Sequence, residues 1–497
     1  MPDDHSSRKT TPSLLSREDL WGPAFLKASR DERRAFQARY ASQREKWVRA
    51  NRYYYGQVER TLRFLIEPQK RVLSIRCQTG FTLEAVAPSR GLGVEISEEM
   101  IAEAKQLRPQ FEYVCADTED IDLGEQFDYI IVNDVFDTVD LLSTLRRVRA
   151  HTQPDSRVLI CNYNRLWQPI LGLASKLGMR MPQLEPNWLS DDDLRNVAEL
   201  AGLEFLRTYR TILFPKWLPF FSWFVNRCIA RLPWLDRLCM IRVLVARPLP
   251  PERDKNEVSV SVIIPCKNEE GNIQSAVERV PDMGRWTELV FCDDKSDDGT
   301  VAEVQRMQRE YPHKRIRLIK GPGICKADNV WTGFEDAAGD VLMILDADLT
   351  VMPEELPAFF NALVEGRGEF INGSRLVYPM KKLAMKHANY AGNKAFASLF
   401  SFILGQRIKD TLCGTKVFWR SDWKRIRPLI GTWGVKDRWG DFELLFCAAR
   451  RNLRIVDLPI HYQERLQGVT KMKRVLGNGC NMLRMAIAAY LKLRGGY

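Results

Sequence analysis

The chain has 497 residues, 45% of them apolar, and it carries 74 Lys and Arg against 63 Asp and Glu, a net charge of +11. This length predicts two or three domains, and the composition excludes a collagen, a disordered chain and a disulfide scaffold. The charge is uneven, because residues 375–497 hold 24 basic and 7 acidic residues, an excess of +17, whereas residues 1–374 sum to −6. No nucleic-acid recognition motif accompanies the basic quarter, so we expect no nucleic-acid partner.

Residues 1–16 are predicted to form a disordered tail, and residues 17–67 a charged helical segment that Pro68 ends. The first residues, MPDDHSSRKTTPS, lack the apolar stretch of a signal peptide, and nowhere do 18 consecutive apolar residues occur. The 11 cysteines include no Cys-x-x-Cys pair, which favours a reduced compartment and argues against zinc. We therefore expect a cytoplasmic protein.

From residue 68 to residue 246, strand-like runs alternate with helical segments, which predicts a parallel, doubly wound sheet. The runs are Arg71–Ile75, Gly91–Glu95, Tyr113–Cys115, Tyr129–Val132, Arg157–Cys161 and Ile241–Ala246. The stretch RPLPPERDKNE at 247–257 is proline-rich and charged, so we expect it to be a linker between two domains.

The strand RVLSI is followed by Arg76-Cys77-Gln78-Thr79-Gly80, a helix, and a strand that ends at Glu95. With this pattern, the region from about Gln69 to Pro248 resembles the class I S-adenosylmethionine-dependent methyltransferases. The resemblance implies that Glu95 binds the cofactor ribose and that Asp117 faces its adenine, with contacts from Thr79 and Gly80. Arg76 and Gln78 stand where two glycines are usual in that family. Methyl transfer, cofactor binding without turnover, and a structural or regulatory domain all remain open.

A second alternation of strands and helices begins directly after the linker, so residues 258–497 are expected to form another domain of the same α/β class. Its strands are Val258–Ile264, Glu288–Cys292, Ile316–Ile319 and Val341–Leu345, with helices from Glu269, Asp298, Ala327 and Pro353. Polar motifs follow three of these strands, at the edge where such sheets bind ligands. One of them holds Asp346 and Asp348, and residues two apart share a face, so both carboxylates can bind one cation.

These motifs resemble glycosyltransferase family 2, the inverting enzymes of the glycosyltransferase-A fold, and within it the polyprenyl-phosphate mannose or glucose synthases. The resemblance implies a UDP- or GDP-linked sugar as donor, with Mg²⁺ or Mn²⁺ on Asp346 and Asp348. It further implies that the donor is bound by Pro265, Asn268, Glu269, Asp293, Lys326, Asp346, Arg375, Arg465 and Lys471. Thr350 stands where the polyprenyl-phosphate enzymes often carry Gln. The fold expected for the whole chain is thus two doubly wound, Rossmann-like domains in tandem.

The acceptor decides whether the reaction needs a base. A glycan or lipid hydroxyl is a poor nucleophile, and Asp410, Asp441 and Glu443 are the residues that can take its proton. A polyprenyl or other lipid-linked phosphate has a second pKa of about 6 and arrives already ionised, so it needs cations instead. We predict metal-dependent transfer to a lipid-linked phosphate; transfer to a hydroxyl and a bifunctional methyltransferase and glycosyltransferase are the alternatives.

Three apolar segments of the chain suit either a buried core or the surface of a membrane. They are Phe214–Val225, Ala395–Leu404 and Met482–Leu493, and the second lies among Lys381, Lys382, Lys386, Lys394, Arg407 and Lys409. An apolar helix with basic flanks is typical of proteins that contact anionic lipid. We therefore expect the protein to be peripheral to the inner face of the cell membrane.

Overall fold

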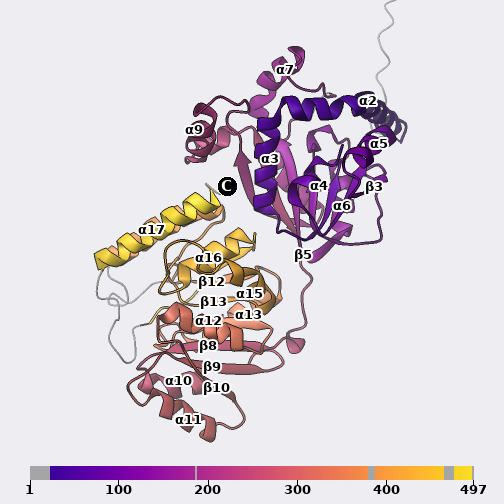
Figure 1. The fold of residues 1–497 in the computed structure, drawn as a ribbon. Coiled ribbons are helices and arrows are strands. Elements are labelled where there is room, and N and C mark those ends of the chain that lie inside the picture. Colours follow the sequence, from indigo (N-terminus) through magenta and orange to yellow (C-terminus); the bar gives the residue numbers. More distant parts are fainter. Residues whose placement is uncertain (1–22, 185–186, 379–386, 464–474, 495–497) are drawn as a thin grey trace, which may run out of the picture.

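The computed structural model describes residues 23–184, 187–378, 387–463 and 475–494. They form two sheets of seven strands each, in the orders β3-β2-β1-β4-β5-β7-β6 and β10-β9-β8-β11-β13-β12-β14. Each sheet belongs to one half of the chain, and the halves are stacked end to end (Figure 1). The expected tandem of Rossmann-like α/β domains is therefore confirmed.

The first sheet is parallel in its centre and antiparallel at one side. The parallel strands are β1 (Arg71–Ile75), β2 (Arg90–Glu95), β3 (Glu112–Cys115), β4 (Phe127–Val132) and β5 (Thr152–Tyr163). Strand β7 (Ile241–Pro248) runs antiparallel to β5 and to β6 (Leu203–Thr211). The sequence predicted an all-parallel sheet and missed β6, whose charged and apolar residues alternate without the continuous apolar run of a buried strand.

The predicted N-terminal helical segment is present as α2 (Pro23–Ala50) and α3 (Arg52–Leu65). Helix α2 lies across the carboxyl edge of the first sheet, and α3 runs down beside α4 (Phe81–Val86) (Figure 1). The further helices of this half are α5 (Glu98–Leu107), α6 (Leu141–Ala150), α7 (Gln168–Lys176), α8 (Asp191–Leu200) and α9 (Phe221–Arg227).

The second sheet begins with four parallel strands, β8 (Val260–Cys266), β9 (Thr287–Asp293), β10 (Arg315–Lys320) and β11 (Val341–Ile344). Strand β13 (Lys416–Trp419) runs antiparallel to β11 and to β12 (Phe370–Ser374), and β14 (Ile455–Pro459) completes the sheet. The helices are α10 (Glu270–Arg279), α11 (Thr300–Glu310), α12 (Lys326–Asp336), α13 (Leu356–Val364), α14 (His387–Leu404), α15 (Arg420–Ile426), α16 (Asp441–Arg450) and α17 (Val475–Leu493).

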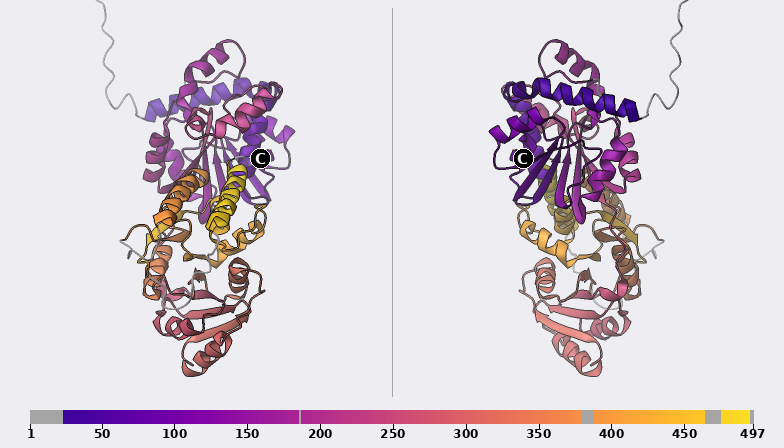
Figure 2. Two further views of the ribbon diagram at one scale, coloured as in Figure 1. Left: turned by 90° about the vertical axis from the view of Figure 1, so that its left-hand side faces the viewer. Right: turned by 90° about the vertical axis from the view of Figure 1, so that its right-hand side faces the viewer.

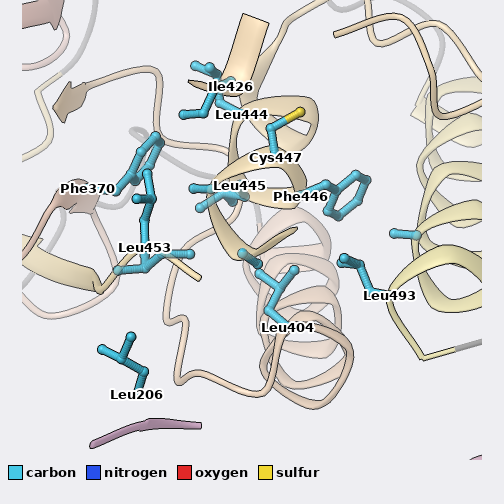
Figure 3. Packing of buried hydrophobic residues seen from close by; sticks show 14 of the residues in the cluster. Leu206, Phe370, Leu404, Ile426, Leu444, Leu445, Phe446, Cys447, Leu453 and Leu493 are labelled. Carbon is cyan, nitrogen blue, oxygen red and sulfur yellow. The ribbon is translucent and has the colours of Figure 1, made fainter. Parts of the chain in front are cut away.

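The two halves share one hydrophobic core. Leu206 of β6 faces Leu404, Leu453 and Phe370 of the second half (Figure 3). Helices α14 and α17 lie side by side against the first sheet (Figure 2), where Tyr209 donates a hydrogen bond of 2.6 Å to the Leu493 carbonyl. The halves are therefore packed against each other, whereas the sequence predicted only a linker between them.

Buried ion pairs cross the same interface. Arg157 of β5 is fully buried and donates two hydrogen bonds, of 2.7 and 2.8 Å, to the Glu369 carboxylate. Glu67, at the end of α3, pairs with Arg425 at 2.9 Å and with Arg451 at 3.1 Å. Since a buried charge is costly without its partner, these contacts tie each half to the other.

The three apolar segments have different environments. In Ala395–Leu404, the side chains of Phe400, Ile403 and Leu404 are buried in the shared core. The segment Phe214–Val225 instead exposes most of its aromatic side chains, so the alternative of a core helix is wrong for it. Helix α17 buries one face and exposes another, on which Leu483, Ile487 and Leu491 lie. None of the described helices is long and apolar enough to cross a bilayer.

Candidate active site

The polar motifs of the second half come together at the carboxyl edge of its sheet. After β8, the amide of Asn268 donates to the Ser296 hydroxyl at 2.9 Å, and the Asn268 side chain accepts from the Asp297 amide at 2.8 Å. After β9, the carboxylate of Asp293 accepts from the Ser296 amide at 3.3 Å. The polar residues predicted to follow β8 and β9 therefore form one hydrogen-bonded surface.

Pro265 and Glu269 lie on the same edge. Pro265 is half-buried in β8, and the Glu269 carboxylate accepts from the Asn272 side chain at 2.8 Å. The Glu269 amide donates to the Thr300 hydroxyl at 2.9 Å, which joins the start of α10 to the start of α11. These contacts place Glu269 beside the surface formed by Asn268 and Asp293.

Lys326 and Asp346 form an ion pair of 2.5 Å at the centre of this edge. Burial alone would lower the pKa of Lys326, but the carboxylates of Asp346, Asp441 and Asp348 outweigh it and raise this pKa. Lys326 begins α12, and a Cβ added at Gly414 would overlap the Asp346 carboxylate. The segment before β13 therefore passes close to Asp346, and a larger residue at Gly414 would displace the Asp346 carboxylate.

Asp348 lies two residues beyond Asp346, as the sequence predicted. Its carboxylate accepts from the Thr350 hydroxyl at 2.9 Å and from the Thr350 amide at 3.2 Å. Two carboxylates this close in the chain, with oxygen ligands only, suit a hard divalent cation such as Mg²⁺ or Mn²⁺. Among the residues that the structure describes, no three His, Cys, Asp or Glu side chains cluster as a complete metal site.

Asp441 is the first residue of α16 and faces this ion pair. Gly440 before it has a φ of +88°, and an added Cβ there would meet the Trp331 ring, so α16 starts close against α12. Burial raises the pKa of Asp441 to about 6, although Lys326 and Lys416 act in the opposite direction. The Lys416 Nζ lies 4.0 Å from the Asp441 carboxylate. A carboxylate that titrates near neutral pH is suited to accept a proton.

The other two predicted bases have different surroundings. Glu443 accepts a hydrogen bond of 2.5 Å from the Gly431 amide, and burial raises its pKa to about 7. Asp410 is fully buried and accepts two hydrogen bonds from the Arg375 guanidinium, at 2.7 and 2.9 Å. Burial would raise the pKa of Asp410, but Arg375 holds it well below its usual range. The low pKa argues against Asp410 as a base. The same hydrogen bonds also occupy Arg375, which was predicted to bind the donor.

Lys416 is the site residue that the sequence interpretation missed. It is fully buried at the start of β13, and its ammonium donates to the Cys413 carbonyl while lying near Asp441. It ends the segment DTLCGTK at 410–416, but only the fold shows that its side chain turns toward the site. Arg465 and Lys471, which were predicted to bind donor phosphates, lie outside the described residues.

The methyltransferase-like half keeps the backbone of a glycine loop but fills it with side chains. Arg76 and Gln78 have φ values of +55° and +50°, in the left-handed region that favours glycine. The Arg76 guanidinium forms an ion pair with Asp137, and the Gln78 side chain donates to the Asp134 carboxylate at 2.5 Å. Both side chains therefore lie across the carboxyl ends of β1 and β4, where this family's cofactor is expected.

The predicted adenosine contacts are also taken by the protein itself. Glu95 is buried, and its carboxylate accepts from the amides of Gln78 and Ile96, both at 2.9 Å. Asp117 pairs with Arg30 of α2 at 3.0 Å, so the N-terminal helix covers this position. Burial raises the pKa of Glu95 even though Arg76 lies nearby.

Thr79 and Gly80 leave little room beside them. The Thr79 carbonyl accepts from Arg108 at 2.9 Å, and a Cβ at Gly80 would overlap the Tyr113 hydroxyl. A cavity lined by Arg76, Gln78 and Asp134 remains, but its volume is only about 80 Å³. Small-molecule sites usually measure about 300–1,000 Å³. The residues of this site therefore do not fit S-adenosylmethionine in this conformation.

Comparison with known families assigns both halves. Residues 261–450 match the model of glycosyl transferase family 2. The chain contains a family 2 glycosyltransferase domain. Residues 43–208 match the model of a methyltransferase domain, and this match begins within α2, so the helical segment is partly included in that domain.

Two curated relatives of the family 2 domain carry similar names. The dolichol-phosphate mannosyltransferase of Pyrococcus furiosus is 35% identical over 167 residues, which cover 32% of this chain and 45% of that protein. The dolichyl-phosphate hexose transferase of Haloferax volcanii is 28% identical over 240 residues, 47% of this chain and 96% of that protein. The chain thus spans less than half the length of the first relative.

Solved structures also resemble the first half. An S-adenosylmethionine-dependent methyltransferase from Thermotoga maritima, described as a possible histamine N-methyltransferase, is 16% identical, with 43% of this chain and 98% of that chain covered. The TM-score of this match is 0.35. The fold of the first half rests on its strand order and on the family match.

Proposed function

We propose that the family 2 domain transfers a sugar, with inversion, from a UDP- or GDP-linked donor to a polyprenyl or other lipid-linked phosphate. The main support for this proposal is the ion pair of Lys326 and Asp346, which lies beside Asp348 and Asp441 at the carboxyl edge of the second sheet. Cations and carboxylates alternate there, as a diphosphate with its metal requires. Relatives named for transfer to dolichyl phosphate support the acceptor class.

Asp346 and Asp348 would hold the Mg²⁺ or Mn²⁺. Such a cation neutralises charge on a diphosphate as it leaves. Lys326 is placed to pair with a phosphate oxygen once Asp346 turns to the cation, because its ammonium already lies within 2.5 Å of that carboxylate. The surface of Pro265, Asn268, Glu269 and Asp293 is the proposed place of the nucleoside. The anomeric bond to the diphosphate breaks as the bond to the acceptor oxygen forms.

A second acceptor class is supported by Asp441. A hydroxyl acceptor must lose its proton, and a carboxylate with a pKa of about 6 is mostly ionised at neutral pH and able to take it. A phosphate acceptor needs no such base. Transfer to a glycan or lipid hydroxyl therefore remains the alternative, with Asp441 favoured over Asp410 as base.

The methyltransferase-like half is proposed to act as a structural partner of the transferase domain, without methyl transfer. Its cofactor loop is filled by Arg76 and Gln78, and its sheet packs on α14 and α17. We accordingly favour a transferase held by a domain that has lost its cofactor over a bifunctional enzyme. A cytoplasmic site of action remains a prediction from the cysteines.

The test is glycosyl transfer by the purified full chain. The protein is incubated with Mn²⁺, polyprenyl phosphate and a panel of labelled UDP- and GDP-sugars, and labelled lipid is the expected product. Asp348→Ala should abolish the labelled lipid, because one carboxylate alone holds the cation poorly. Asp340→Asn is the matched control, since Asp340 lies at the opposite end of β11 and its carboxylate accepts its described hydrogen bonds from Ser259, away from the site. Unchanged transfer by Asp348→Ala would refute the metal assignment.

A further inference from the structure

The first half of the chain exposes a group of large aromatic side chains around α9, which we call the aromatic face. Its members are Trp217, Phe220, Phe221, Trp223, Phe224 and Trp234. Phe220 is 89% exposed, Trp234 78% and Trp217 65%. Soluble proteins seldom expose a contiguous apolar surface without a partner, so this face requires an explanation.

Buried polar side chains hold the backbone of the aromatic face in a defined conformation. Asn226 is buried, and its side chain accepts from the amides of Leu213 and Phe214 while donating to the Phe214 carbonyl, with all three distances between 2.7 and 2.8 Å. The Ser222 hydroxyl likewise holds the Leu218 amide at 2.6 Å. These polar side chains fix the turn that leads into α9, and its aromatic side chains point outward.

Two of the exposed aromatic residues have an unfavourable backbone conformation. Phe220 and Trp234 have φ values of +58° and +69°. Bulky residues rarely adopt positive φ, and such strain is found where function requires a particular orientation. Since Phe220 and Trp234 are also the most exposed of the group, the strain serves exposure and not core packing.

The segments that form and border the aromatic face carry mainly basic residues. The segments at 164–184 and 212–240 contain seven Lys and Arg residues and a single acidic residue, Asp236. Asp236 is buried and paired with Arg494 at 3.2 Å and Arg210 at 3.5 Å, so no acidic side chain of these segments is exposed. Lys216, Arg227 and Arg237 are exposed beside the aromatic residues. Aromatic rings with a basic rim match the interface of an anionic bilayer.

The aromatic face continues onto the transferase domain through α17. Tyr490 of α17 donates to the Arg231 carbonyl at 3.2 Å, beside the Arg494 pair with Asp236. The exposed stripe of Leu483, Ile487 and Leu491 then extends the apolar surface along α17. Helices α9 and α17 lie on the same side of the molecule (Figure 1). The other face of α17 packs on α16, the helix that begins at Asp441.

We propose that the aromatic face, together with the outer stripe of α17, is a docking surface for an anionic lipid bilayer. The methyltransferase-like half thereby holds the transferase at the membrane in addition to packing against it. That this contact presents a lipid acceptor to the active site rests on the proposed function. The membrane binding itself stands on the exposed aromatic residues, their strain and their basic rim.

The experiment is flotation of the full chain with vesicles of phosphatidylcholine, alone or mixed with phosphatidylglycerol. We expect binding to the mixed vesicles, weaker binding to phosphatidylcholine, and loss of binding as NaCl is raised. The variant Trp217→Ser, Phe220→Ser, Trp223→Ser should lower the partition coefficient about tenfold or more, because these rings no longer enter the interface. The matched control is Leu107→Ser, Leu200→Ser, Leu249→Ser, which changes three exposed apolar residues elsewhere.

Equal binding of the aromatic variant and the parent protein would overturn the proposal, as would a parent that binds neither kind of vesicle. If the parent instead sediments as a dimer that the aromatic variant converts to monomers, the face is a subunit interface and the proposal is wrong. Flotation is measured without donor or acceptor, so failure of glycosyl transfer leaves this result unaffected. Thermal melting of both variants checks that their folds are intact.

Discussion

At the scale of single residues, two aspartates near the same site have opposite environments. Asp410 is buried against Arg375 and Asn393, so its negative charge is fully compensated and its pKa is depressed. Asp441 is also buried, but among the described residues the cation paired with it, Lys416, stays 4.0 Å from its carboxylate, and burial raises its pKa to about 6. Neighbouring carboxyl groups whose pKa values are driven apart commonly have different roles. Asp410 is therefore paired with Arg375, whereas Asp441 has a pKa that suits the proposed role of a proton acceptor.

We predict that Asp441→Asn separates the two acceptor classes. With a hydroxyl acceptor, kcat should fall by about 10²–10⁴-fold, because the general base is lost. The parent activity should also rise with pH through about 6, since only the ionised carboxylate accepts a proton, and this rise should be absent in the variant. With a phosphate acceptor, the variant should retain most of its activity. Initial rates measured from pH 5 to pH 8 test this, a range of about one to two units around that pKa.

Glu443→Gln is the discriminating companion to this variant. Glu443 lies in the same turn of α16 and has a similarly raised pKa, but its carboxylate faces the Gly431 amide. Loss of the pH-dependent rise in Glu443→Gln, with its retention in Asp441→Asn, would show that the base has been assigned to the wrong carboxylate.

At the scale of elements, the loop after β1 and helix α2 together close the methyltransferase-like site. The loop retains left-handed backbone at Arg76 and Gln78, which is the shape that glycines would give it. Its side chains reach Asp137 and Asp134, and Arg30 of α2 reaches Asp117. The contacts that a cofactor would make have been replaced by contacts within the chain. The sequence showed the missing glycines, but only the structure shows that the new side chains fill the space.

This closure predicts that S-adenosylmethionine does not bind the full chain. Calorimetric titration should give no binding heat, and the melting temperature should be the same with and without the ligand. A ligand present at 100 times its dissociation constant would stabilise the fold by about 2.7 kcal/mol, an effect easily seen in melting. Saturable binding of S-adenosylmethionine or S-adenosylhomocysteine would contradict the prediction and restore the cofactor-binding alternative.

At the scale of the whole molecule, the two halves share a core and buried ion pairs. Arg157 donates to Glu369 and also to the Asn452 carbonyl at 2.9 Å, so one buried guanidinium joins β5 to two segments of the other half. Arg247, at the end of β7, is likewise buried and donates to the Gly366 carbonyl at 2.8 Å. A flexible linker between independent domains would leave such groups in water.

We predict that the full chain unfolds in one cooperative thermal transition and that Arg157→Ala destabilises it by about 3–5 kcal/mol. Removing one partner of a buried pair leaves the other charge uncompensated, which explains this magnitude. Arg306→Ala is the matched control, because Arg306 pairs with Glu303 and Glu310 on the exposed surface of α11 and should change stability little. Calorimetry and urea unfolding measure both. Two separate transitions in the parent protein would show that the halves are independent.

The sequence by itself determined the two α/β domains, the positions of the central strands along the chain, and the positions of the Asp346/Asp348 and Asn268/Glu269 motifs. These features are local, because a buried parallel strand is a short apolar run and its carboxyl end brings the polar residues after it to one edge. Strands β6 and β12–β14, which form the mixed parts of the two sheets, were not predicted.

The tertiary structure alone decided which carboxylate is compensated, which cation is buried and which apolar segment is exposed. Asp410, Asp441 and Lys416 owe their environments to residues distant in the chain, and so do Phe400 in the core and Phe220 at the surface. Burial and charge compensation depend on long-range packing, which local composition does not encode. The excess of positive charge in residues 375–497 was visible in the sequence, but the exposure of the aromatic face, which lies in the other half of the chain, emerged only when the chain folded.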